Sequence, residues 1–146
     1  ENFDWVHSVD RLKVAQRLNA QRSITQQPLK VCIQVNINDE QSKSGIPLSE
    51  LNSLSNAIAE LPNLELKGLM TIPASPQSES ALRVSFREMS CAFDALKEKH
   101  PTVDTLSMGM SSDIETAIEE GSTMVRVGTA LFGARTPAAE EKKPNN

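Results

Sequence analysis

Short apolar runs and longer periodic segments alternate along this chain. The runs predict five strands, at residues 5–9, 29–37, 64–73, 105–110 and 123–133. The run at 29–37 is β-branched and nearly continuous in apolar character, which is typical of a strand covered on both faces. A buried parallel sheet is the arrangement that such a strand favours.

The segments between these runs have helical spacing. Helices are predicted at residues 10–22, 48–61, 82–96 and 112–121. One apolar face of the longest is formed by Leu82, Phe86, Met89, Phe93 and Leu96. Ser112 and Glu115 have the spacing of a capping box at the start of the last helix, and Gly121 would end it.

Strands that alternate with helices indicate a parallel α/β architecture. The pattern leaves two arrangements open, a doubly wound sheet and part of a (β/α)8 barrel. In both, function belongs at the carboxyl ends of the strands. Those ends present Asn36, Asn38, Thr71, Ile72, Met110, Ser111, Gly128 and Thr129.

Composition narrows the class of protein. With 146 residues, 38% of them hydrophobic and 23% charged, the chain has the size and balance of one globular domain. A net charge of −4 gives no reason to expect a nucleic-acid partner. No apolar run approaches the roughly 20 residues of a membrane span, and the N-terminus lacks the features of a signal peptide. We expect a cytoplasmic protein that has no membrane partner, with a disordered tail at 136–146.

The cysteines and histidines give weak signals. Cys32 and Cys91 match no metal or redox spacing, so reduced core thiols are expected and no metal site is predicted. His100 stands at a probable helix end, where a cation suits the helix dipole. His7 belongs to the first short strand and could face a site, although a structural histidine is the favoured interpretation.

The last two strands end in small and hydroxyl-bearing residues. One ends in the sequence SMGMSSD and the next in RVGTALFG. Backbone N–H groups and Ser or Thr hydroxyls at such ends form anion sites, and in barrels the loops after the last two strands are the usual phosphate cradle. Taken singly, Gly128 reads as a tight turn and Ser112 as a helix cap. Together, with Arg126 in a strand where an unpaired guanidinium would cost several kcal/mol, they favour a phosphate-bearing ligand.

Four ordered motifs carry a resemblance. HSVDRLKVAQRLN, QVNINDEQSKSGI, LKGLMTIP and LSMGMSSDIETAIEEGSTMVRVGTALFGAR are together similar to the pyridoxal phosphate homeostasis protein family, whose members are single-domain barrels like the N-terminal domain of alanine racemase. The resemblance runs from Asp4 to Arg135. It implies a parallel (β/α) barrel of TIM type, with about five of the eight β/α units in this chain. Residues 1–135 would be the C-terminal part of that single domain.

The resemblance also implies a cofactor, pyridoxal 5′-phosphate (PLP), and roles for particular residues. Ser111, Gly128 and Thr129 would hold the 5′-phosphate, and Arg126 would face the pyridine nitrogen. A fixed guanidinium disfavours a second positive charge beside it, so the nitrogen stays unprotonated. An unprotonated pyridine is a poorer electron sink, which suits a carrier. Ser107 and Met110 would be neighbours of the site, and no catalytic residue is assigned.

The family's Schiff-base lysine lies on the first barrel strand, in a segment resembling V-S-K upstream of the matched region. The lysines of this chain are Lys13, Lys30, Lys43, Lys67, Lys97, Lys99, Lys142 and Lys143. Only Lys43 falls on a loop at the functional end, where a solvated side chain is expected. We therefore expect the covalent anchor to be missing from this chain, and PLP binding by the chain alone to be weak or absent.

Three functions follow from these observations. The favoured one is a non-catalytic protein that binds PLP and balances vitamin B6 pools. An alanine-racemase-like enzyme would use a catalytic tyrosine, and this sequence contains no tyrosine. A phosphosugar lyase or isomerase would need an acid–base pair where the strand ends present amides and hydroxyls. The intact family is expected to be monomeric, and the exposed strand edges of a half-barrel would favour association.

Overall fold

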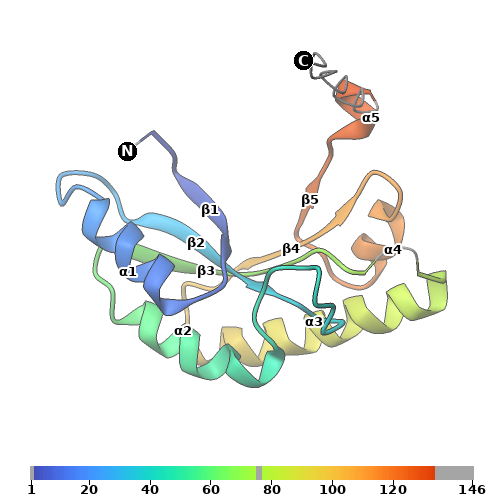
Figure 1. The fold of residues 1–146 in the computed structure, drawn as a ribbon, viewed down its shortest axis with the longest axis horizontal. Coiled ribbons are helices and arrows are strands. Elements are labelled where there is room, and N and C mark those ends of the chain that lie inside the picture. The colour runs from blue at the N-terminus through green and yellow to red at the C-terminus, as the bar shows by residue number, and fades with distance from the viewer. Residues whose placement is uncertain (1, 75–76, 134–146) are drawn as a thin grey trace, which may run out of the picture.

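The computed structural model describes residues 2–74 and 77–133, and its strands form one parallel sheet in the order β1-β2-β3-β4-β5 (Figure 1). The strands are β1 (Trp5–Val9), β2 (Leu29–Val35), β3 (Leu64–Thr71), β4 (Thr105–Met110) and β5 (Met124–Arg126). Each strand pairs with its neighbour in sequence, without the reversal of order that defines a doubly wound sheet. The sheet curls, so that β1 and β5 rise on either side of β3, as in half of a barrel.

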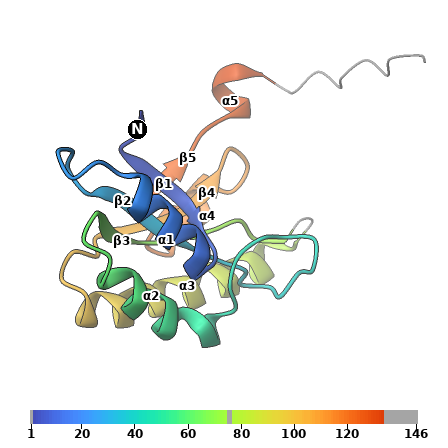
Figure 2. The same cartoon turned by 60° about the vertical axis from the view of Figure 1, so that its left-hand side comes forward.

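Helices cover the convex side of this sheet (Figures 1 and 2). They are α1 (Leu12–Gln21), α2 (Leu51–Ala59) after the short 3-10 helix η1 (Leu48–Glu50), α3 (Glu79–Lys99) and α4 (Ile114–Glu119). A fifth, α5 (Thr129–Phe132), follows β5 and lies away from the sheet in both views. No described helix is long and apolar enough to cross a membrane.

The hydrophobic core lies between the convex face and the helices. Alternate residues of β2, namely Val31, Ile33 and Val35, are at most 1% exposed and pack in one cluster with residues of α3. The cluster also includes Leu106, Met108, Phe86, Met89, Phe93 and Leu96. Burying each such side chain contributes about 1.5–3 kcal/mol, so this layer holds the helices against the sheet.

The concave face carries the intervening residues and is more polar. Cys32 and Ser107 are fully buried there, outside the apolar cluster. Near the amino ends of the strands, the Lys67 ammonium pairs with Asp104 at 2.5 Å and with Glu65 at 3.6 Å. Near the carboxyl ends, the corresponding partly buried cation is Arg126.

Gly68 sets the approach of β3 to β4. Its φ is +153°, and a Cβ built on it would lie 1.7 Å from the Thr105 carbonyl oxygen. Only glycine fits where its own strand and the partner backbone come so close. The register pairs Gly68 with Thr105 and, at the other end, Met110 with Arg126.

Three sequence-based expectations are wrong in detail. The fifth strand ends at Arg126 because the chain turns at Gly128 into α5. Ser112 does not cap α4: Asp113 occupies the N-cap position, and its carboxylate accepts a hydrogen bond from the Met110 N–H. Cys91 is exposed because it lies off the apolar face of α3, whereas Cys32 is buried as expected. The tail predicted at 136–146 lies outside the described residues.

Candidate functional site

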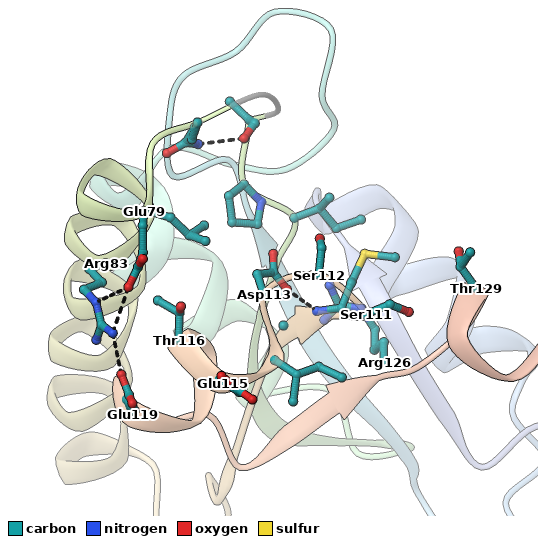
Figure 3. Close-up of a pocket in the computed structure, with 18 of the residues that line it drawn as sticks. Glu79, Arg83, Ser111, Ser112, Asp113, Glu115, Thr116, Glu119, Arg126 and Thr129 are labelled. Carbon is teal, nitrogen blue, oxygen red and sulfur yellow. Dashed lines mark hydrogen bonds and ion pairs between the residues drawn. The ribbon is translucent and has the colours of Figure 1, made fainter. Parts of the chain in front are cut away.

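A cleft opens at the carboxyl ends of β3, β4 and β5 (Figure 3). Its volume is about 1200 Å³, above the roughly 300–1,000 Å³ of typical ligand pockets, so it is an open groove. Its walls are the strand ends, the segment Ile72–Ala74 and the amino-terminal parts of α3 and α4. The cleft lies where sequence reasoning places function in a parallel α/β protein.

Arg126 is fixed at the edge of this cleft by neutral acceptors. Its Nη1 donates to the Ser107 carbonyl oxygen at 3.0 Å and to Ser107 Oγ at 2.9 Å, and its Nη2 donates to the Thr71 carbonyl oxygen at 2.9 Å. Burial lowers the pKa of the Arg126 guanidinium, and the nearby charge of Asp113 opposes that shift. Arginine stays charged under such shifts. No carboxylate forms an ion pair with Arg126 within residues 2–74 and 77–133.

Ser107 is hydrogen-bonded directly to Arg126. From the sequence, Ser107 was expected only as a neighbour of the site. Ser107 lies in the middle of β4 and is fully buried. Its hydroxyl oxygen also lies 3.2 Å from His7 Nδ1. From β1, His7 therefore contacts the serine that binds Arg126. The sequence allowed His7 to face a site and favoured a structural histidine.

The ends of β4 and β5 meet on one side of the cleft. Ser111 Oγ accepts a hydrogen bond from the Ala130 N–H at 3.3 Å, which ties the loop after β4 to α5. Thr129 begins α5, and Figure 3 shows Ser111, Arg126 and Thr129 on the same side of the cleft. Met110 lines the cleft and is 43% exposed. All six residues predicted for the site thus lie at or next to this edge of the sheet.

Neither the backbone conformation of Gly128 nor its contacts with the described residues require a glycine at this position. Its φ is −120°, outside the left-handed region, and a Cβ built on it would meet no atom within 4 Å. A glycine in open space beside a charged cleft allows a ligand to approach the backbone closely. The feature fits a bound phosphate, as does an Arg126 charge without a carboxylate partner.

The opposite side of the cleft carries a compensated guanidinium. Arg83 pairs with Glu79 at 3.1 Å, with Glu119 at 2.5 Å and with Glu120 at 3.4 Å (Figure 3 shows the first two pairs). The hydrogen bonds that Arg83 donates to Glu119 and Glu79 raise its pKa. Because this charge is neutralised within the chain, Arg83 joins α3 to α4 and is a weaker candidate for an anionic ligand.

Two asparagines, named in the sequence only as strand-end residues, organise the loops above the cleft. Asn38 Nδ2 donates to Ser85 Oγ at 3.0 Å, and Asn38 Oδ1 accepts from the Ala74 N–H at 2.9 Å. Asn36 holds its own loop through the Glu40 carbonyl oxygen and N–H. An amide directly after a buried strand is the signal that could have identified them.

Lys43 lies in the loop that Asn36 holds. It lines the cleft, and its exposure is intermediate. The turn at Gly45 explains the fold of the loop, because its φ is +123° and a Cβ would lie 2.6 Å from the Asn36 nitrogen. The S-K-S-G segment therefore shapes one wall of the cleft.

Comparison with known proteins gives consistent matches. The family model described as alanine racemase, N-terminal domain, matches residues 1–136. The pyridoxal phosphate homeostasis protein of Escherichia coli K12 is 58% identical over 136 residues, which are 92% of this chain and 58% of that protein. The protein of the same name from Haemophilus influenzae is 49% identical over 145 residues, 98% of this chain and 61% of that protein. The chain thus spans about three fifths of the length of these relatives.

Solved structures agree on the fold. PipY of Synechococcus elongatus PCC7942, solved with PLP bound, superposes with a TM-score of 0.81 at 32% identity, over 90% of this chain and 61% of PipY. Alanine racemase from Corynebacterium glutamicum superposes with a TM-score of 0.63 at 22% identity, over 96% of this chain and 39% of that chain, which supports the fold alone. The prediction of part of a (β/α) barrel is confirmed, as is the resemblance to pyridoxal phosphate homeostasis proteins.

Proposed function

The chain belongs to the alanine racemase N-terminal domain family, and on that premise we propose that it forms the ring- and phosphate-binding side of a PLP site that holds the cofactor for other proteins. One observation carries the proposal: Arg126 is a half-buried, permanently charged group held by neutral acceptors at the edge of an open cleft. An anionic ligand in the cleft would add negative charge near Arg126, which forms no ion pair among the described residues. PipY with PLP bound and the names of the bacterial relatives support PLP as that ligand.

The phosphate and the pyridine nitrogen of the cofactor would each have matching groups in the chain. The hydroxyls of Ser111 and Thr129 and the backbone N–H at Gly128 would bind the phosphate, and Arg126 would face the pyridine nitrogen. PLP supplies an electrophilic aldehyde and an electron-withdrawing ring. Beside a guanidinium the pyridine nitrogen would stay unprotonated, and a neutral pyridine ring withdraws electron density less strongly than a pyridinium ring. That state suits storage and delivery of the cofactor better than turnover.

A binding role fits the residues at the strand ends better than a racemase-like one. Alanine racemases use a tyrosine as an acid–base group, and the sequence has none. The strand ends present amides and hydroxyls, which bind and orient ligands but are poor acid–base groups at neutral pH. The relatives are longer than this chain, so we assign the cofactor's covalent lysine to none of its residues.

The test compares PLP with pyridoxal, which lacks the phosphate, in the full-length protein that contains this sequence. Ligand-free protein is titrated with each compound and the visible absorption is followed. Removal of both hydroxyls, in the variant Ser111→Ala with Thr129→Val, should weaken PLP at least about tenfold and leave pyridoxal unchanged. Ser53→Ala, an exposed hydroxyl on α2, is the matched control. Equal losses for both ligands, or no loss for PLP, would contradict the proposed phosphate site.

A second measurement addresses the lysine assignment. Reduction of the PLP-loaded protein with borohydride, followed by peptide mapping, marks the lysine that bonds to the cofactor. The proposal expects no marked lysine within this sequence. A stoichiometric mark on Lys43, which lines the cleft, would move the covalent anchor into this chain.

A further inference from the structure

A chain of hydrogen bonds crosses the concave face from β1 to β5. His7 Nδ1 on β1 lies 3.2 Å from Ser107 Oγ on β4, and the same oxygen lies 2.9 Å from Arg126 Nη1 on β5. Arg126 Nη2 continues to the Thr71 carbonyl oxygen on β3. His7 and Arg126, which are 119 positions apart in the sequence, thus share the fully buried Ser107 hydroxyl.

The chemistry of the three groups sets the direction of these bonds. A guanidinium can only donate, so Ser107 Oγ accepts from Arg126. The hydroxyl hydrogen of a buried serine needs an acceptor of its own. Within the described residues Ser107 Oγ contacts no third polar group, so His7 Nδ1 is the acceptor available to it. His7 must then be neutral, with its proton on Nε2.

We infer that His7 is a positioning residue for Arg126: as a neutral acceptor it orients the Ser107 hydroxyl, which in turn fixes the guanidinium at the edge of the cleft. The consequence for a ligand rests on the proposed function, because it concerns the group that faces the cofactor ring. The hydrogen-bond chain itself is a property of the protein without ligand. If His7 were protonated, its Nδ1 could no longer accept from the Ser107 hydroxyl, and a second cation would lie near Arg126.

The other groups on the concave face leave this pairing undisturbed. The titratable or charged side chains there are Lys30, Cys32, Glu65, Lys67 and Arg126, with Asp104 just before β4 and Asp113 near Arg126 after β4. Burial raises the pKa of the Cys32 thiol to about 12, so it is uncharged at neutral pH. Lys30 lies over the Trp5 ring, and Lys67 is neutralised by its carboxylate partners. Burial and the charge of Arg126, in that order, lower the pKa of His7.

The first experiment is an NMR titration of the ligand-free, full-length protein with 15N-labelled histidine. The inference predicts a neutral His7 at pH 7 with its proton on Nε2, and His100 serves as the histidine away from this chain of hydrogen bonds. Arg126→Gln should raise the pKa of His7, because the neighbouring charge is removed. A proton on Nδ1, a charged His7 at pH 7, or a His7 pKa unmoved in Arg126→Gln would overturn the inference.

The second experiment measures the dissociation constant of PLP between pH 5.5 and 8 for wild type, His7→Asn and His7→Leu. Wild type should bind more weakly as His7 becomes protonated. His7→Leu, without an acceptor, should weaken binding about 3- to 10-fold at pH 8. His7→Asn can present an amide oxygen to Ser107 and should restore most of the affinity while removing the pH dependence due to His7.

The two experiments separate the two claims. Equal affinity in all three proteins, or equal loss in both variants, would contradict a positioning role for His7. Failure of wild type to bind PLP at any pH would contradict the proposed function, while the NMR titration would still report on the hydrogen-bond chain.

Discussion

The two ends of the concave face hold a partly buried cation in opposite ways. At the amino ends of the strands, Lys67 meets the carboxylates of Asp104 and Glu65. At the carboxyl ends, Arg126 meets two carbonyl oxygens and a hydroxyl, all neutral. Both cations are held in place, but only the first is neutralised.

Under the proposed function, the difference separates a structural end of the sheet from a binding end. In an ion pair the two charges neutralise each other, so the pair attracts no further ion, and it stabilises the strands that carry it. A charge fixed by neutral dipoles keeps its attraction for an anion, and its geometry is set before the ligand arrives. Gly68 and Gly128 repeat the contrast, because the first is required by the backbone contact with Thr105 and the second faces open space.

The largest expected effect on stability comes from a substitution at the structural end of the sheet. Gly68→Ala places a Cβ against the Thr105 carbonyl oxygen at a φ of +153°, so strain and overpacking add. We expect the free energy of unfolding to fall by more than about 3 kcal/mol. Denaturant unfolding followed by circular dichroism measures it. A loss below about 1 kcal/mol would mean that β3 and β4 are not held as closely as the structure has them.

The next effect compares the two cations directly. Arg126→Gln should cost about 1–3 kcal/mol, because buried acceptors on Ser107 and Thr71 lose their donors. It should also weaken PLP at least about tenfold. Lys67→Gln should cost at most about 1 kcal/mol, since Asp104 is largely exposed, and leave PLP binding unchanged. The same effect of both variants on PLP would remove the distinction between the two ends.

A smaller effect concerns pH at the structural end. Burial acts to raise the pKa of Asp104, but hydrogen bonds from Lys67 and Thr105 outweigh it and the net shift is downward. The unfolded chain therefore binds this proton first, so the Asp104 contribution to stability is present above pH 4 and is lost as the pH falls through the lower folded value. Asp104→Asn should remove at most about 1 kcal/mol at pH 7 and flatten the acid limb of the stability curve. An unchanged acid limb would contradict this ion pair.

The smallest effect on stability is expected at the binding end. Gly128→Ala should change the free energy of unfolding by no more than about 0.5 kcal/mol, because the added methyl group meets no described atom. It should still weaken PLP, because the methyl group occupies space beside the phosphate. Paired unfolding and binding curves measure both. A stability loss like that of Gly68→Ala would show that Gly128 is structural.

Local pattern predicted the elements well. The bounds of β1 and β4 follow directly from the apolar runs at 5–9 and 105–110, and the apolar face of α3 from its spacing. Proximity of Ser111, Arg126 and Thr129 follows from strand order, because adjacent parallel strands end at the same edge of the sheet. These features depend on spacing along the chain, which the sequence contains.

Contacts between side chains that are distant in the sequence could not be predicted from that pattern. The contact of His7 with Ser107 joins strands that are not neighbours in the sheet and exists only because the sheet curls. Asn38 likewise binds groups on the loop and helix after β3. At the start of α4 the predicted Ser112 cap is replaced by Asp113, whose carboxylate accepts a hydrogen bond from the Met110 N–H and not from the helix. Such outcomes depend on three-dimensional packing.

The most direct test of the difference between the two ends is a crystal structure of the full-length protein with PLP. The account predicts the phosphate within hydrogen-bond distance of Ser111 and Thr129, and the ring nitrogen facing Arg126. Lys67 should keep its pairing with Asp104 unchanged. A phosphate bound at Arg83, or a cofactor that leaves Arg126 bonded only to Ser107 and Thr71, would contradict it.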